Sequence, residues 1–184
     1  MNRAYFMHAR ARYFAQQGRS AGALAPPITT GFGGVDGTVN AAIWLPDGGW
    51  IVGGTFANAQ PYLSAGVLGA SVARANLARF NSDGSLHAWN PGANNTVRAL
   101  AIAGTDVIAG GLFATLGGAS RSRIGAVPLD SNTATSWNPD ANNTVYSLAV
   151  NGTDTIVAGA FTAMTTPPVL QTVLNRFAVF RNNL

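Results

Sequence analysis

The stretch WNPGANNTVRALAI at residues 89–102 decides the fold, because it returns almost unchanged as WNPDANNTVYSLAV at residues 137–150. The two stretches lie 48 residues apart (137 minus 89), and the match continues without a gap through Gly-Thr-Asp at 104–106 and 152–154. Self-similarity at a fixed period of about 40–50 residues indicates a repeat architecture. The repeat is therefore the unit from which the rest of the chain is interpreted.

A third and more divergent copy begins near residue 32 and contains Ile-Val-Gly-Gly-Thr-Phe at 51–56. Each copy divides into four short apolar runs separated by Gly, Asn, Asp and Ser positions that suit tight turns. In the middle copy these runs span 97–102, 107–113, 123–129 and 134–137. Four strands in a unit of this length predict a β-propeller blade. We expect an all-β, propeller-like fold of about three four-stranded antiparallel blades, approximately at 32–89, 89–137 and 137–184.

Composition supports strands. The 184 residues carry 11 basic and 7 acidic side chains, and all of them are Arg or Asp, so the strong helix formers Lys and Glu are missing. With 22 Gly and no Cys, the chain has neither a disulfide framework nor a thiolate site. No apolar run reaches the roughly 18 residues that span a bilayer, and the first residues lack the apolar stretch of a signal peptide. We expect no membrane span and no export signal within this chain.

The N-terminal 31 residues read differently from the repeats, and we expect a separate appendage there. Residues 2–17 favour a helix, whereas the alternative is a strand, because residues 12–18 resemble a worn copy of residues 78–84. Four of the 11 Arg fall in the first 19 residues, interleaved with aromatic residues. A solvated helix face explains them better than a nucleic-acid site, so we expect no nucleic-acid partner.

Three copies fall short of the four to eight blades that usually close a propeller ring. The chain is therefore expected either to be the fragment of a longer propeller or to form a homo-oligomer, for example a six-bladed dimer. The last copy also lacks a counterpart for its fourth strand, which the N-terminal appendage could supply as a clasp. Unpaired edge strands would otherwise invite aggregation.

Catalysis is disfavoured because each acidic residue has a turn-forming reason to be where it is. These residues are Asp36, Asp47, Asp83, Asp106, Asp130, Asp140 and Asp154. The two histidines, His8 and His87, are far apart and do not have the spacing of metal ligands. We therefore predict no enzyme activity, no metal and no cofactor.

One repeated set of side chains suggests ligand binding. An indole followed by a pair of amides is an arrangement with which lectins hold sugars by stacking and hydrogen bonding. The candidate residues are Trp89, Asn94 and Asn95 in one copy, and Trp137, Asn142 and Asn143 in the next. The alternative interpretation is that each Trp packs between blades and donates its indole N–H to a backbone carbonyl. A residue repeated in every unit favours that structural role.

The repeat resembles the bacterial delta-sixty repeat, a propeller-forming repeat of large surface or secreted proteins. The resemblance covers about residues 32–180 and implies a propeller fold and an extracellular or cell-surface location, with no catalytic residues to carry over. The pieces that carry it are Val-Arg-Ala-Leu-Ala at 97–101, Ile-Ala-Gly-Gly-Leu-Phe at 108–113, Arg-Ser-Arg-Ile at 121–124, Asn-Ser-Asp-Gly-Ser-Leu at 81–86 and Trp-Asn-Pro at 89–91.

Together these observations favour a non-enzymatic binding or interaction scaffold, with a glycan or a protein as ligand. The copies differ most in length after the second apolar run, so we expect the ligand on the variable segment 57–74 or near the Asn pairs. A carbohydrate-binding lectin and a fragment of a propeller glycosidase or lyase are the alternatives. A pair of converging Asp side chains would favour the enzyme.

Overall fold

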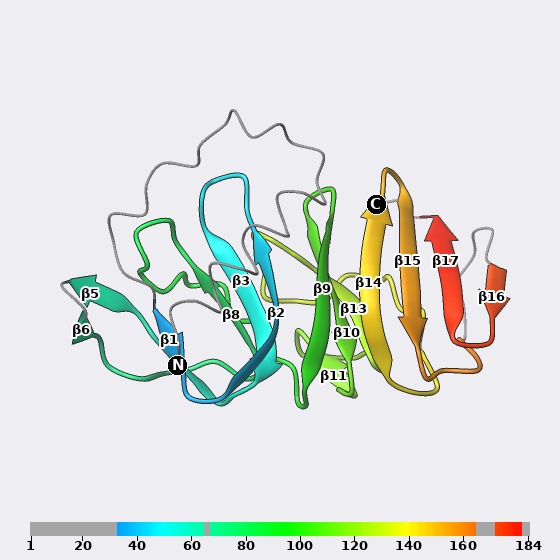
Figure 1. Cartoon of the computed structure of the whole chain (residues 1–184), viewed down its shortest axis with the longest axis horizontal. Helices are drawn as coiled ribbons and strands as arrows, with labels where there is room; N and C mark the ends of the chain where they lie inside the picture. The colour runs from blue at the N-terminus through cyan, green and yellow to red at the C-terminus, as the bar shows by residue number, and fades with distance from the viewer. Residues whose placement is uncertain (1–32, 65–66, 165–171, 182–184) are drawn as a thin grey trace.

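The computed structural model describes residues 33–64, 67–164 and 172–181, and all regular structure in these ranges is β. The predicted helix at residues 2–17 and the rest of the N-terminal appendage lie outside the described residues. Three antiparallel sheets stand side by side, with their first strands β2, β9 and β14 adjacent (Figure 1). The prediction of an all-β, propeller-like fold is confirmed.

We call the three main sheets blade 1, blade 2 and blade 3. Blade 1 consists of β2 (Thr38–Trp44), β3 (Trp50–Thr55) and β8 (Leu77–Phe80). Blade 2 consists of β9 (Val97–Ala103), β10 (Asp106–Gly111) and β13 (Ile124–Pro128). Blade 3 consists of β14 (Val145–Asn151), β15 (Asp154–Gly159), β17 (Phe177–Arg181) and β16 (Thr172–Leu174), in that spatial order.

The expected fourth strand is much reduced in blades 1 and 2. The segment 134–137 is not a strand, and the Thr135 N–H donates to the Ala126 carbonyl of β13 at 2.9 Å. In blade 1 the His87 N–H donates to the Arg79 carbonyl in the same way. Proline follows two residues after Trp in each segment and cannot donate to a ladder, which limits strand length. In blade 3, β16 takes this edge position and comes from before β17.

The core lies between the blades. Apolar side chains of blades 1 and 2 form one buried cluster around Ile51, Leu77, Val97 and Leu100, and blades 2 and 3 form another around Ile108, Ile124, Val145 and Val157. Each sheet therefore buries one face against the next. Removing this apolar area from water, at roughly 25 cal/mol per Å², is the main force that holds neighbouring blades together.

Glycine makes the close approach of the blades possible. A Cβ added to Gly53 would come within 2.5 Å of Val97 Cγ1 in blade 2, and one added to Gly110 within 2.5 Å of Val145 Cγ1 in blade 3. The residue at the same register position in blade 3 is Ala158, because it pairs with Phe177 as Gly110 pairs with Ile124. Blade 3 thus has a Cβ at the position where blades 1 and 2 require glycine.

The long segment between β3 and β8 covers the outer face of blade 1. It contains β4 (Asn58–Gln60), β5 (Tyr62–Ser64), β6 (Val67–Leu68) and β7 (Val72–Ala73), and β4 pairs with β1 (Gly34–Val35). Ala59 of this segment is buried in a cluster with Trp50 and Phe80 of blade 1, and the Tyr62 N–H donates to the Gly84 carbonyl at 3.0 Å. A segment expected as an exposed loop is therefore also a cap on the first blade. Blade 2 has only the short hairpin β11 (Thr115–Leu116) and β12 (Ala119–Ser120) in its place.

Candidate functional site

The first Asn of each repeated pair is a structural clamp. The Oδ1 atom of Asn94 accepts hydrogen bonds from the backbone N–H groups of Ala114 and Thr115, at 2.8 and 3.0 Å. Asn142 accepts from the N–H groups of Thr162 and Ala163 at 2.9 and 3.1 Å. The clamp ties the loop that enters a blade to the loop that follows its second strand. Both amide oxygens are therefore already used by the fold.

Blade 1 builds the same clamp with a carboxylate. Oδ1 of Asp36 accepts from the N–H groups of Ala57 and Asn58 at 2.9 and 3.0 Å, and Oδ2 accepts from the Asn58 side chain. These hydrogen bonds, led by the Asn58 N–H, lower the pKa of Asp36. The sequence shows Asp in one copy and Asn in two, and only the structure shows that all three do one job.

The second Asn of each pair makes a local contact. Asn95 Oδ1 accepts from the Thr96 N–H at 2.7 Å and Asn143 Oδ1 from the Thr144 N–H at 2.8 Å. Both Asn side chains are exposed. Asn95 and Asn143 lie just before the starts of β9 and β14.

Both tryptophans pack against the clusters between blades, Trp89 as a buried and Trp137 as a half-buried side chain. Trp89 is 3% exposed, and its indole N–H donates to the Pro128 carbonyl of blade 2 at 2.9 Å. Trp137 packs against the cluster between blades 2 and 3, edge-on to Phe180 with ring centroids 5.9 Å apart. A sugar stacks on an open ring face, and the buried indole of Trp89 has none to offer.

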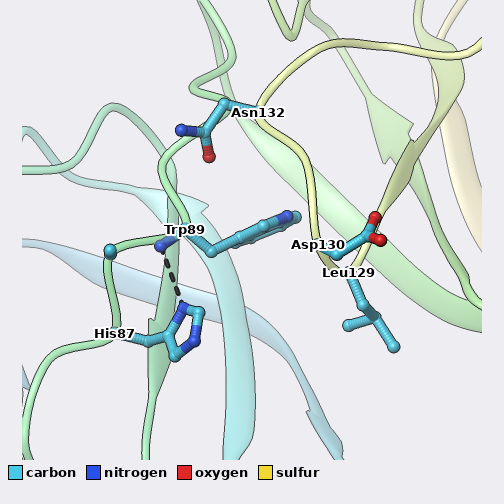
Figure 2. A pocket seen from close by; sticks show the side chains of 6 residues that line it. His87, Trp89, Leu129, Asp130 and Asn132 are labelled. Atoms are coloured by element: carbon cyan, nitrogen blue, oxygen red, sulfur yellow. Dashed lines mark hydrogen bonds between the residues drawn. The ribbon is translucent and has the colours of Figure 1, made fainter.

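A small depression lies beside Trp89, at the end of the blades opposite the Asn pairs. Its volume is about 150 Å³, and its lining consists of His87, Ala88, Trp89, Leu129, Asp130 and Asn132 (Figure 2). Small-molecule sites usually enclose roughly 300–1,000 Å³, so this depression has room for a fragment of a ligand at most. Sequence reasoning missed it because its two walls come from segments about 40 residues apart.

The polar groups of the depression are mostly committed to the fold. His87 Nδ1 accepts the Trp89 N–H at 3.0 Å, and Asn132 Oδ1 accepts the Asn90 N–H at 2.6 Å. Burial, followed by the positive charge of Arg79, lowers the pKa of His87, which favours the neutral imidazole that this hydrogen bond requires. In Figure 2 the Asp130 carboxylate points away from His87.

Two of the aspartates have the turn roles that the sequence indicates. Asp47 Oδ1 accepts the Gly49 N–H at 2.8 Å, while its other oxygen forms an ion pair with Arg79 at 2.7 Å. Asp83 accepts from the N–H and hydroxyl of Ser85, and the hydroxyl bond is the main cause of its lowered pKa.

The predicted turn role is wrong for Asp36, which forms the clamp of blade 1, and turn chemistry alone does not account for Asp106. Asp106 begins β10, is 7% exposed, and its pKa is raised by burial and then by the negative charge of Asp130.

Within the described ranges no cluster of three His, Asp or Glu side chains could hold a metal ion. Likewise, no described helix could cross a membrane.

Exposed apolar side chains concentrate on the segment that caps blade 1. Leu63, Val67, Leu68 and Val72 are 62, 56, 42 and 39% exposed, and they make up four of the six large apolar residues exposed in the described part of the chain. The hairpin β5–β6 that carries three of them projects from the end of the molecule beyond β1 (Figure 1). The sequence indicated this segment by its length, whereas its apolar exposure depends on the structure.

A row of β-bulges along the first strands also escaped sequence reasoning. The pairing skips Asn40 in β2, Arg98 in β9 and Tyr146 in β14, which are equivalent positions. The Asn40 side chain donates to the Val97 carbonyl at 3.0 Å, and the Arg98 guanidinium lies over the Tyr146 ring, 5.6 Å from its centroid. Each of the first two bulged residues therefore reaches onto the next blade.

Comparisons with known proteins add little to this picture. No family model matches the chain, and no curated protein matches it. Among solved structures, the chain is similar to the crystal structure of the computationally designed Ika4 protein. The two are 12% identical with a TM-score of 0.44, over 84% of this chain and 97% of the designed chain.

Proposed function

We propose that this chain is a non-enzymatic, propeller-like repeat module that binds a protein partner through the hairpin β5–β6 and the adjoining β7. The observation that carries the proposal is the gathering of exposed Leu63, Val67, Leu68 and Val72 on one inserted segment. Scattered apolar residues on a surface are normal, whereas exposed apolar residues that gather on one segment favour an interaction site.

The surroundings of the other candidates favour this site over a small-molecule or sugar site. Trp89 is buried, the first Asn of each pair is engaged with backbone N–H groups, and the depression beside His87 is small. The hairpin, in contrast, is the part in which the first repeat differs most from the other two. Binding sites are commonly built on such variable segments over a regular scaffold.

The resemblance to the delta-sixty repeat supports the wider setting of this proposal. The resemblance implies a bacterial surface or secreted assembly, and it brings no catalytic residues to carry over. Asp47 and Asp83 have turn roles and Asp36 has the clamp role, so these three carboxylates are engaged by the fold and are not candidates for acid–base chemistry.

Two probes test the proposal. Selection of peptides from a random phage-displayed library on the immobilised chain should yield apolar sequences, and the pair Leu63→Ser with Leu68→Ser should weaken their binding at least about tenfold. The matched control is Tyr146→Ser, because Tyr146 is 55% exposed and lies on blade 3. A glycan array should remain silent. Peptide binding that survives the hairpin substitutions, or specific binding to a sugar, would refute the proposal.

A further inference from the structure

The face of blade 3 that points away from blade 2 is apolar and open among the described residues. In blade 2 the equivalent face is covered: the cross-strand triplet Ala101–Ile108–Ala126 is buried against blade 3. The corresponding triplet in blade 3 is Ala149–Ile156–Val179, of which Ala149 is exposed and the others half-buried. The terminal repeat of a soluble array normally has a polar outer face. This face therefore has the composition of an interface.

The neighbouring triplet strengthens the comparison. Ala99–Gly110–Ile124 is buried in blade 2, and its counterpart in blade 3 is Ser147–Ala158–Phe177. Ile124 is fully buried, whereas the larger Phe177 is 40% exposed. Phe177 projects from this face. The small side chains of Ala158 and Ser147 beside it leave a flat area that can receive the Phe177 of another copy.

Two features indicate that a further blade of the same repeat does not cover this face. Ala158 stands where Gly53 and Gly110 are needed, since a Cβ there would come within 2.5 Å of the next blade's valine. In addition, Thr172 of β16 pairs with Val179 and so occupies the edge on which a continuing chain would lay its next segment, as Thr135 does in blade 2. A further blade of this repeat therefore does not fit against blade 3, although the outer face of blade 3 is apolar rather than polar.

The other end of the molecule excludes a head-to-tail arrangement. In blade 1 the face that a preceding blade would cover carries Trp50 and Phe80, which are stacked at 5.7 Å and buried. Ala59 of the capping segment lies in the same cluster, and Tyr62 fixes that segment to Gly84. A second copy therefore cannot present its first blade to the open face of blade 3.

We propose that two copies of this chain associate through the outer faces of their third blades, with a two-fold axis that places each Phe177 against Ala158 and Ser147 of the other copy. An interface that uses the same patch on both subunits is isologous, so association stops at the dimer. The capping segments then lie at the two far ends of a six-bladed assembly. The interface is independent of the hairpin assigned above to a protein partner.

Sedimentation velocity of the full chain between about 1 and 100 µM tests the proposal. The wild type should sediment as a dimer of twice 18.9 kDa. Phe177→Asp should raise the dissociation constant at least about tenfold, because it places a charge at the centre of an apolar contact. Leu63→Asp is the matched control, since Leu63 is even more exposed but lies at the capped end, and it should leave the dimer unchanged. Circular dichroism of both variants verifies that they remain folded.

Cross-linking identifies which faces meet. The chain has no cysteine, so Ala158→Cys introduces a single thiol into the face of blade 3, on the middle strand β15 that the two-fold axis sets against its own copy. Under mild oxidation this variant should form disulfide-linked dimers, whereas Leu63→Cys should not. A wild-type monomer at 100 µM, a dimer that Leu63→Asp weakens and Phe177→Asp does not, or a disulfide between Leu63→Cys and Ala158→Cys chains would each overturn the proposal.

Discussion

A methyl group added at Gly110 tests whether the blades pack as closely as described. Gly110 has no left-handed backbone angle, so an alanine is compatible with its conformation, but the new Cβ would come within 2.5 Å of Val145 Cγ1 and 3.3 Å of Leu148 Cδ1. Val145 is fully buried, and protein interiors are close-packed. Overpacking of a core by one methyl costs about 1–3 kcal/mol.

The backbone effect of the substitution has the opposite sign. Replacing Gly by Ala at a compatible position stabilises a protein by about 0.4–1 kcal/mol through the unfolded chain. The net expectation for Gly110→Ala is therefore a loss of about 1–2 kcal/mol in the free energy of unfolding. For a chain of this size that corresponds to a fall of about 2–8 °C in the melting temperature. Urea unfolding followed by tryptophan fluorescence measures the loss directly.

Two matched variants show whether the clash is the cause. Val145→Ala removes two buried methyl groups and should cost about 2 kcal/mol by itself. In the double variant the methyl of residue 110 enters the vacated space, so the combined loss should be smaller than the sum of the single losses by about 1 kcal/mol. Ala158→Gly, at the equivalent position of the open face, should cost only about 0.5–1 kcal/mol. A neutral Gly110→Ala, or strictly additive losses, would refute the packing argument.

Two further predictions concern the clamp and the depression. Asn142→Ala removes the acceptor of two backbone N–H groups and should cost about 1–2 kcal/mol in urea unfolding, whereas Asn142→Asp should be close to wild type because Asp36 fills this role in blade 1; equal losses in both variants would contradict the clamp. Burial and the charge of Arg79 lower the pKa of His87 below 6.5, so the folded state binds fewer protons than the unfolded state, and stability should fall as the pH decreases below about 6.5. His87→Asn, whose Oδ1 can accept the Trp89 N–H without titrating, should flatten that part of the melting-temperature profile, and a profile identical to wild type would exclude His87 as the cause.

Much of the architecture could be predicted from the sequence, because each blade forms from one continuous stretch of the chain. The 48-residue offset aligned the first strands β9 and β14 and their clamps, and the Gly-rich second strands followed from the same alignment. The prediction of a full fourth strand was less successful. Hydrogen bonding of one residue in that segment is enough to close the edge, and apolar content alone does not distinguish such a segment from a strand.

The candidate site was harder to predict because repetition does not reveal what a side chain faces. A Trp that recurs in each repeat, as Trp89 and Trp137 do, is expected both for a packing residue and for a ligand platform. Only the burial of Trp89 and its hydrogen bond to Pro128 identify it as a packing residue. The bulged residue Arg98 gives no sequence signal at all. A bulge is a property of the pairing between two strands, and register is fixed only when both strands are in place.

The order of the residues was sufficient for the repeat, the β class and the small number of carboxylates, because these depend on period and composition. Which faces are covered was decided by the tertiary structure. The segment between β3 and β8 folds back over blade 1 and closes that end, while no described segment does the same for Phe177 and Ile156 on blade 3. Burial is a relation between segments distant along the chain, so the same repeat carries a covered face in blade 2 and an open one in blade 3.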